Sequence, residues 1–330
     1  MKHYVLKTTK KDGTTYNGFK WPTEVGAKVT APDWKPTNGC GNGLHGWLNG
    51  KGDGTIGHIK DEGCLWMVLE TDSYIDLVDK VKFESCTILH VGDRLSATKF
   101  LRNLVPDATR MIGESIEAGD NEDSIVGDYG IATAGYFGIA TAGNRGTATA
   151  GYRGTATAGD IGTATAGHYS TATAGNGGTA TAGDWGKATA EDYGKATAGY
   201  KGIATAGDWG TATAGYEGTA TAGDWGKATA GYRGKATAGN FGTATAGDRG
   251  TATAGDWGTA TAGNGGKATA GYEGIATAGY EGTAIAGEKG IVQITYESGG
   301  RWRLLTGYIG EDGLEPNTPY KVRNGKFVKD

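Results

Sequence analysis

The sequence predicts a mostly β protein: a two-sided parallel β-solenoid between a small N-terminal α+β domain and a C-terminal β cap. Three observations lead to this prediction. Residues 127–294 form 21 consecutive octapeptides without an insertion or deletion. Nearly every octapeptide reads Gly, a variable pair, Gly, and then four residues in which Ala alternates with Thr, Lys or Ile. Residues 1–110 and 295–330 lack this period. A strict short period is typical of a solenoid, in which each unit buries a face only against its neighbours.

Residues 1–110 predict the small α+β domain, because apolar runs with strand periodicity precede one run with helical spacing. An acidic stretch at 115–124 follows, and residues 111–126 are expected to be a linker that also caps the first rung. The expected strands are residues 3–8, 27–30, 64–70 and 81–90, and the expected helix is 97–104.

The octapeptide itself predicts a four-residue strand and a tight corner. In Thr-Ala-Thr-Ala the side chains alternate between two faces. Lysine takes the first of these positions in five units, and a lysine row is not buried unpaired, so the Ala face points inward. Two glycines in every eight residues argue against a helix. We expect these glycines to supply the positive φ of the corners.

A second period of 16 residues indicates two strands and two corners in each coil. In alternate units the second residue is Asp or Asn, beginning with Asp128, and in the other units it is mostly Tyr. The units then make about 10.5 coils, which at ~4.8 Å per rung is a stack roughly 50 Å long. Asp and Asn side chains are expected to bond nearby backbone amides and form a ladder at their corner.

Residues 295–330 predict the C-terminal β cap. The sequence IVQITYESGGRWRLLTGYIG predicts two strands around a Ser-Gly-Gly turn, and residues 320–322 and 326–328 predict a second pair around Asn324-Gly325. Solenoids require such a cover because the last rung otherwise exposes an unpaired strand edge.

Composition excludes several classes of function. The net charge is −4 for the whole chain and −2 across residues 127–290, so a nucleic-acid-binding track is not expected. The first residues contain no apolar core of a signal peptide, and no stretch approaches 18 apolar residues, so neither secretion nor a membrane span is expected. Three cysteines are an odd number that suits a reducing compartment. The expected location is the cytoplasm or a virion.

The N-terminal domain holds weak candidates for metal binding or catalysis. Cysteine and histidine side chains could ligate zinc, but their spacings match no standard finger or knuckle. A Cys40/His45 nucleophile pair lacks a carboxylate placed by spacing to orient it. We therefore favour a glycine-rich turn with structural Cys and His, no cofactor and no enzymatic activity. The four candidates are Cys40, His45, His58 and Cys64.

Two corners of the solenoid carry recurring aromatic residues. One strip recurs every 16 residues in the third position and predicts a surface for a protein partner or for stacked sugar rings, or a ladder that only stiffens the corner. It comprises Tyr193, Trp209, Trp225, Phe241 and Trp257. The opposite corner is a self-association candidate, with Tyr136, Tyr152, Tyr200, Tyr216, Tyr232 and Tyr280.

The outward Thr-Ala-Thr rows, the Gly corners and the Tyr corner resemble the repeats of bacterial ice nucleation proteins. The resemblance covers residues 127–294 and implies water-organising Thr rows and self-association along the Tyr corner. Lysines interrupt the fifth-position rows, so no intact run of Thr-Ala-Thr exceeds three coils. The ice-binding candidates are Thr147, Thr149, Thr163, Thr165, Thr179 and Thr181.

Most of the chain is similar to uncharacterised bacterial and bacteriophage proteins that join a small N-terminal domain to Ala/Thr-rich repeats. Their Cys-x-x-Gly-Leu-His type motif is carried here by Cys40, Asn42, Gly43, Leu44 and His45. This resemblance implies a bacterial or phage origin and supplies no activity. Our first hypothesis is a non-enzymatic solenoid that self-associates or binds a protein or carbohydrate. The alternatives are ice binding, and a metal or catalytic role around Cys40 and His45.

Overall fold

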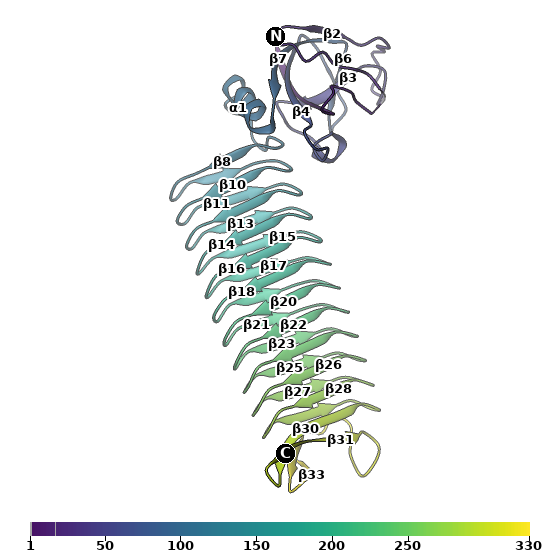
Figure 1. Ribbon diagram of the computed structural model, residues 1–330, viewed down its shortest axis with the longest axis vertical. Helices are drawn as coiled ribbons and strands as arrows, with labels where there is room; N and C mark the ends of the chain where they lie inside the picture. Colours follow the sequence, from purple (N-terminus) through teal and green to yellow (C-terminus); the bar gives the residue numbers. More distant parts are fainter. Residues whose placement is uncertain (1, 17) are drawn as a thin grey trace. The chain divides into compact units, whose positions relative to one another are not determined.

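The structure is a computed structural model that describes residues 2–16 and 18–330. The chain forms two compact units, and each is described by itself. The first comprises Met1–Ala118, Ser124–Thr133 and Thr141–Thr147, and the second comprises Gly119–Asp123, Ala134–Ala140 and Ala148–Asp330. Figure 1 shows an antiparallel domain at the N-terminus and a long stack of short parallel strands. The predicted fold class is confirmed.

The N-terminal domain is a seven-stranded sheet in the order β2-β7-β4-β1-β3-β6-β5, in which every neighbouring pair is antiparallel. The expected strand at 81–90 is two strands that separate at Glu84. Strand β3 was not predicted. The strands are β1 (His3–Thr9), β2 (Lys28–Thr30), β3 (Leu44–Leu48), β4 (Leu65–Thr71), β5 (Ile75–Asp76), β6 (Val81–Phe83) and β7 (Ser85–Gly92).

Both faces of this sheet are covered, because adjacent residues of its central strands enter different cores. On β1, Val5 joins one core and Leu6 the other. Helix α1 (Arg94–Leu104) covers the second core with Ala97 and Leu101, and a 3₁₀ turn spans Gly54–Ile56. The helix begins three residues before its expected start because Asp93 caps it, accepting a hydrogen bond from the Ser96 N–H at 2.8 Å.

The solenoid strands form two parallel sheets, which we call the first and second sheets. Neighbouring strands pair with a 16-residue offset, so identical residues stack, as in Thr163 beside Thr179. The first sheet contains β8 (Ser115–Glu117), β10 (Ile131–Ala134), β12 (Thr147–Ala150), β14 (Thr163–Ala166), β16 (Thr179–Ala182), β18 (Lys195–Ala198), β20 (Thr211–Ala214), β22 (Lys227–Ala230), β24 (Thr243–Ala246), β26 (Thr259–Ala262), β28 (Ile275–Ala278), β30 (Ile291–Ser298) and β31 (Arg301–Tyr308). The second sheet contains β9 (Asp123–Ile125), β11 (Ile139–Ala142), β13 (Thr155–Ala158), β15 (Thr171–Ala174), β17 (Lys187–Ala190), β19 (Ile203–Thr205), β21 (Thr219–Thr221), β23 (Lys235–Ala238), β25 (Thr251–Ala254), β27 (Lys267–Ala270), β29 (Thr283–Ala286), β32 (Tyr320–Arg323) and β33 (Lys326–Lys329).

The expected inward Ala face is confirmed, since the repeat alanines are at most 4% exposed. The expected role of the glycines is wrong. Positive φ lies on the third residue of each octapeptide, between 51° and 59° wherever that residue is not Gly. The first and fourth glycines are required for space instead. A Cβ on Gly207 would lie 2.2 Å from Asp192 Oδ1, and one on Gly210 would lie 2.7 Å from the Ala206 Cβ.

Residues 111–126, expected as a linker, hold strands β8 and β9 and have the geometry of two divergent octapeptides. Their third residues, Gly113 and Asn121, have positive φ like those of the repeats. Glutamate replaces the fourth glycine at Glu114 and Glu122. The coil conformation therefore starts before Gly127, where the sequence period becomes visible.

The predicted C-terminal cap is present. Strands β30 and β31 pair antiparallel around Gly299-Gly300, and β32 pairs with β33 around Asn324-Gly325. All four of these turn residues have positive φ, as a two-residue hairpin turn requires. Strand β32 also pairs with β29 at Ala284. The cap therefore covers the last rung of both sheets.

Candidate interaction surfaces of the solenoid

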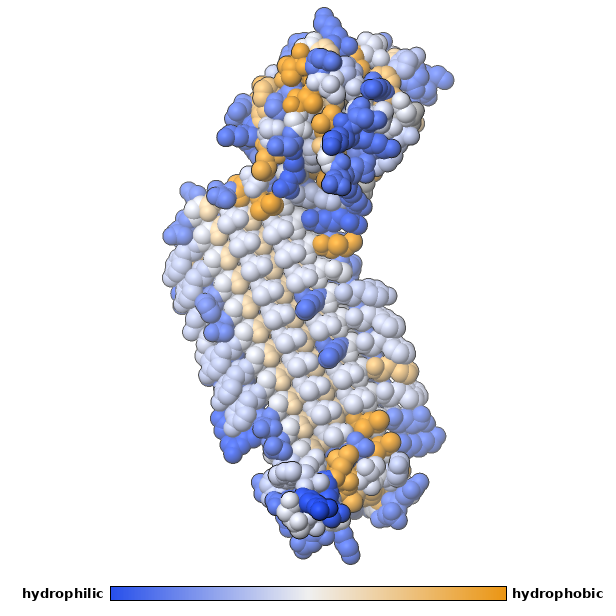
Figure 2. All heavy atoms as spheres, in the orientation of Figure 1, coloured by the Kyte–Doolittle hydropathy of each residue, from blue (hydrophilic) through white to orange (hydrophobic). Residues whose placement is uncertain are grey.

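The outward faces of the two sheets carry rows of threonine. In Figure 2 the coils present regular columns of residues of intermediate hydropathy, interrupted by single hydrophilic residues. The fifth-position rows are interrupted as predicted, and their lysines are exposed. These lysines are Lys195 and Lys227 in the first sheet and Lys187, Lys235 and Lys267 in the second.

The seventh-position rows are unbroken until the last coil, where Ile285 and Gln293 replace Thr; the prediction overlooked this by following only the fifth position. The 16-residue period alone could have shown this. Most of these threonines are partly exposed. In the first sheet the row is Thr133, Thr149, Thr165, Thr181, Thr197, Thr213, Thr229, Thr245, Thr261 and Thr277, and in the second it is Thr141, Thr157, Thr173, Thr189, Thr205, Thr221, Thr237, Thr253 and Thr269.

The third-position aromatic residues stack along one edge as predicted. We call this strip the aromatic edge. Its neighbouring rings are within 8° of parallel, with centroids 6.3, 5.0, 4.2 and 5.1 Å apart in chain order. The strip ends at Trp257, whose Nε1–H donates to Glu273 Oε2 at 2.9 Å. Each ring is 42% to 70% exposed: Tyr193, Trp209, Trp225, Phe241 and Trp257.

The opposite Tyr corner is longer than predicted. At His168 and Asp184, where the second residue is not Tyr, an aromatic residue occupies the third position, as Tyr169 and Trp185. These two rings contact each other with centroids 6.0 Å apart and join Tyr152 to Tyr200. Tyr280 lies apart from this series and contacts Trp302 of the cap. The corner comprises Tyr136, Tyr152, Tyr169, Trp185, Tyr200, Tyr216 and Tyr232.

Basic side chains line the Tyr corner, whereas the aromatic edge is flanked by few. The Lys201 ammonium lies 4.7 Å from the Trp185 ring centroid and 3.3 Å from Glu217 Oε2. The Arg153 guanidinium lies within 6 Å of the rings of Phe137, Tyr152 and Tyr169. Such contacts hold the rings in place and cover part of their faces. The aromatic edge consequently offers the more accessible apolar surface.

The predicted ladder of Asp and Asn side chains is confirmed. In most coils the Oδ1 accepts a hydrogen bond from the backbone N–H one coil further on, as from Asp208 N–H to Asp192 at 2.9 Å and from Asp224 N–H to Asp208 at 2.8 Å. These amides lie at corners, outside the strand ladders, so the side chains supply acceptors that they otherwise lack.

The four N-terminal candidates do not converge on a metal site. Cys40 is exposed, and the Cys64 thiol contacts the Ile59 carbonyl at 3.9 Å. His58 Nδ1 lies 2.7 Å from Asp61 Oδ2, while His45 Nε2 is buried with no hydrogen-bond partner among the described residues. Across residues 2–16 and 18–330, no group of three or more His, Cys, Asp or Glu is arranged to hold a metal ion.

The stacked parallel coils and their periodic surface rows together show that this chain is a β-solenoid repeat protein. The repeats are similar to Ice nucleation protein InaU of Pantoea ananas and to an ice nucleation protein of Enterobacter agglomerans, with 32% identity over 101 residues in both cases. The similar segment is 29% of this chain but only 10% and 8% of the two relatives. No family model and no solved structure matches the chain significantly. No helix among the described residues is long and apolar enough to span a membrane.

Proposed function

We propose that the solenoid is a non-enzymatic protein that orders water at an ice surface through its Thr rows. The seventh-position rows carry the proposal, because they repeat one hydroxyl and one methyl group on successive coils of each sheet, up to the last coil. The similarity of the repeats to proteins named for ice nucleation supports it.

The physical argument rests on regular spacing. Neighbouring strands lie ~4.8 Å apart, and outward residues two positions apart in a strand are separated by about 6.6 Å. Where both outward positions are Thr, they form a grid of hydroxyl and methyl groups. The hydroxyls donate and accept hydrogen bonds, so water molecules on the grid take fixed mutual distances. The buried Ala and the in-register backbone ladders keep the grid from deforming.

The interruptions set the size of the active area. A lysine ammonium is strongly hydrated and carried on a flexible stem, so it disturbs the water over its coil. In the first sheet the longest run with Thr at both positions is β12, β14 and β16, which contains the six predicted ice-binding threonines. We place the principal water-ordering area there.

The test replaces outward threonines in this run with a bulky residue. Thr165→Tyr with Thr181→Tyr should abolish thermal hysteresis and any elevation of the freezing temperature, because the rings lift water off the grid. The matched control is Thr189→Tyr with Thr205→Tyr in the second sheet, where Lys187 and Ile203 already break the grid. Circular dichroism checks folding. A wild-type protein without effect on freezing, or equal effects of the two pairs, would refute ice binding.

A second function is favoured by the aromatic edge: association with another copy of this chain. Five exposed, nearly parallel rings make a contiguous apolar strip of a kind that usually marks a contact surface. A second solenoid presents rings at the same coil spacing, so the two strips match along their length. Stacked sugar rings are the alternative ligand.

Light scattering after size-exclusion chromatography tests this second function on the wild type and on a Trp209/Trp225/Trp257→Ser variant. A wild-type oligomer and a folded, monomeric variant support self-association. The control variant Tyr200/Tyr216/Tyr232→Ser removes rings from the other corner and should leave the oligomer intact. Monomeric wild type excludes self-association by this edge and directs attention to sugar binding.

A further inference from the structure

The N-terminal unit contains a cavity of about 500 Å³ that none of the functions above uses. Strands β1 and β3 form its floor, and residues 15–16, 18–21, 32–43 and 56–58 and the turn at Lys80 form its walls. Aromatic side chains line it, including Tyr16, Trp21 and Trp47. This volume and lining are typical of pockets for small organic ligands.

Positive side chains outnumber negative ones in the lining of this cavity. Lys7 and Lys80 line it against a single carboxylate, Asp33, which already accepts a hydrogen bond from Asn42 Nδ2 at 3.3 Å. The Lys7 ammonium lies 5.5 Å from the Trp21 ring centroid. Burial, and then the charge of Lys80, lowers the pKa of Lys7 to about 8. An anion in the cavity would relieve both effects.

A neighbouring lysine shows that this imbalance is specific to the cavity. Lys82 is fully buried, but its ammonium donates to the Gly39 carbonyl at 2.9 Å and lies 5.7 Å from the Trp34 ring centroid. Its charge is therefore compensated by the fold. In the described part of the chain no such hydrogen bond compensates Lys7, which is directed at the cavity instead.

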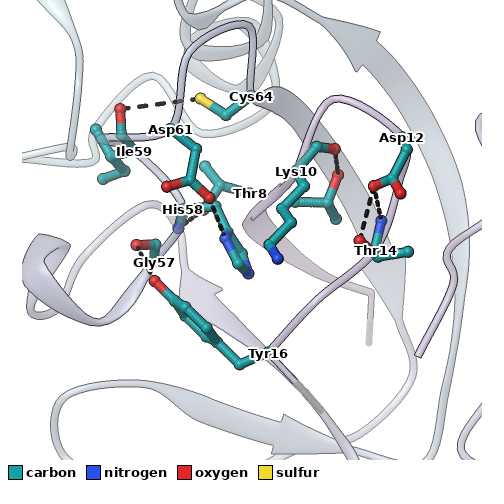
Figure 3. A network of polar contacts seen from close by, with 11 residues as sticks. Thr8, Lys10, Asp12, Thr14, Tyr16, Gly57, His58, Ile59, Asp61 and Cys64 are labelled. Atoms are coloured by element: carbon teal, nitrogen blue, oxygen red, sulfur yellow. Dashed lines mark hydrogen bonds and ion pairs between the residues drawn. The ribbon is translucent and has the colours of Figure 1, made fainter. Parts of the chain in front are cut away.

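Two histidines add unsatisfied polar atoms to the same lining. His58 is 2% exposed, and its Nε2 is buried without a hydrogen-bond partner among the residues described. Figure 3 shows Asp61 directed at its ring, with Asp61 Oδ2 2.7 Å from Nδ1, and the Tyr16 hydroxyl directed at the Gly57 carbonyl. The Tyr16 and His58 rings are stacked, with centroids 3.9 Å apart. With Nδ1–H donated to Asp61, Nε2 is an acceptor. His45 Nε2 is likewise buried and unpartnered.

We propose that this cavity binds a small planar aromatic anion, with its phosphate or carboxylate group at Lys7 and Lys80. The ring of the ligand packs among the aromatic side chains, and a ligand hydroxyl or N–H donates to His58 Nε2. Lys7 and His58 Nε2 then gain the partners that their burial requires. The ligand class follows from the combination of lysines and aromatic side chains in one cavity. The lysines alone would accept any anion, and the aromatic lining alone would accept any apolar ring.

Isothermal titration of the full chain with phenyl phosphate, 4-hydroxybenzoate, uridine monophosphate and inorganic phosphate tests the proposal. At least one aromatic anion should bind ten or more times as tightly as inorganic phosphate. Lys7→Gln should weaken its binding at least tenfold, and Lys99→Gln, an exposed helix lysine outside the cavity, should leave it unchanged. Absence of binding by all three aromatic anions at millimolar concentration, or equal binding by Lys7→Gln, overturns the proposal.

The wild type supplies a second readout if Lys7→Gln does not fold. An anion that binds next to Lys7 requires its protonated form, so affinity should fall about tenfold per pH unit above pH 8. The other titratable groups that face the same cavity are Tyr16, Asp33, Cys40, His45, His58 and Lys80. A constant affinity from pH 7 to 9.5 would contradict the proposed contact. The freezing assay is independent of this outcome, because the Thr rows belong to the repeats.

Discussion

At the scale of single residues, the third position of the octapeptide carries the backbone strain of the solenoid. Residues in the left-handed conformation cost roughly 1 to 2 kcal/mol unless they are glycine. Yet Gly is found there only at Gly177 and Gly265 in the repeats. The other residues at this third position, many of them aromatic, gain stacking contacts that offset the strain. Ile161 is the exception, since it is β-branched, exposed and outside both aromatic series.

Ile161→Gly should therefore be more stable than Ile161→Ala. Both variants remove the same exposed side chain, but only Ala keeps a Cβ at a φ of 56°. We expect the Gly variant to exceed the Ala variant by about 1 kcal/mol, even though Gly has the more flexible unfolded state. Parallel thermal and urea unfolding measures the difference. An Ala variant as stable as the Gly variant would show that this conformation costs little here.

His45 should make the N-terminal domain sensitive to acid. Burial, and then the charges of Lys80, Lys7 and Lys82, lowers its pKa from 6.5 to about 4. The unfolded chain then binds a proton first, so stability is full above pH 6.5 and decreases as the pH falls toward 4. His45→Gln should flatten this dependence in urea unfolding, with His168→Gln, an exposed histidine of the repeats, as the control. An unchanged slope for His45→Gln would contradict the assigned pKa.

At the scale of elements, the two glycines of each unit meet two different steric constraints at the corners. The first glycine of a unit leaves room for the backbone of the preceding coil and, where that coil has Asp or Asn, for its side chain, while the fourth leaves room for an Ala methyl. Ser170 replaces a fourth glycine and shows when another residue is tolerated at this position. Its hydroxyl is buried but contacts the carbonyls of Gly151 and His168 at 3.0 and 2.9 Å. Space, rather than φ, selects glycine at these positions.

Gly207→Ala should accordingly destabilise the solenoid far more than Gly177→Ala. The new methyl of the first variant would collide with Asp192, whereas that of the second meets only Ile161 Cγ1, at 3.7 Å. We expect a loss above 2 kcal/mol for Gly207→Ala and about 1 kcal/mol for Gly177→Ala, the latter from positive φ alone. Thermal unfolding followed by circular dichroism compares them. If Gly177→Ala were the more damaging change, φ and not space would control the corners.

The same distinction explains what the sequence could predict about the elements. The period of eight sets strands, inward face and coil size, because every unit has the same environment. The period cannot show which residue of the unit has positive φ, since Gly recurs at a fixed spacing for either of two physical reasons. One is a positive φ, and the other is a lack of space for a Cβ. Strand β3 was missed because it follows a glycine-rich loop and contains Gly46, where a Cβ would lie 2.4 Å from Val5 Cγ1. Strands β8 and β9 were missed because Glu114 and Glu122 replace the glycines that mark the period.

At the scale of the whole molecule, the sequence predicts the surfaces that are built from periodic residues and not those that are built from irregular loops. The aromatic edge and the Asp/Asn ladder follow from residues 16 apart and were predicted. The cavity of the N-terminal unit was not, because it depends on side chains from four loops and two strands that no spacing connects. The Cys40 and His45 motif lies in the lining of this cavity.

The lysine interruptions allow the proposed ice binding to be strengthened as well as destroyed. Lys195→Thr with Lys227→Thr would extend the Thr-Ala-Thr grid of the first sheet over eight consecutive strands, from β12 to β26. Because both lysines are exposed and point away from the Ala core, the fold should tolerate the changes. A larger grid holds more water molecules in register, so thermal hysteresis should increase and nucleation should occur at a higher temperature.

The control is Lys51→Thr with Lys60→Thr, which makes the same change in charge at exposed positions of the N-terminal unit. Freezing activity should rise only when the new threonines complete the grid. Equal activity of the two variants would mean that lost positive charge, and not the Thr array, governs freezing. A decrease on completing the grid would contradict water ordering by this sheet, because the proposal requires activity to grow with the number of adjacent intact coils.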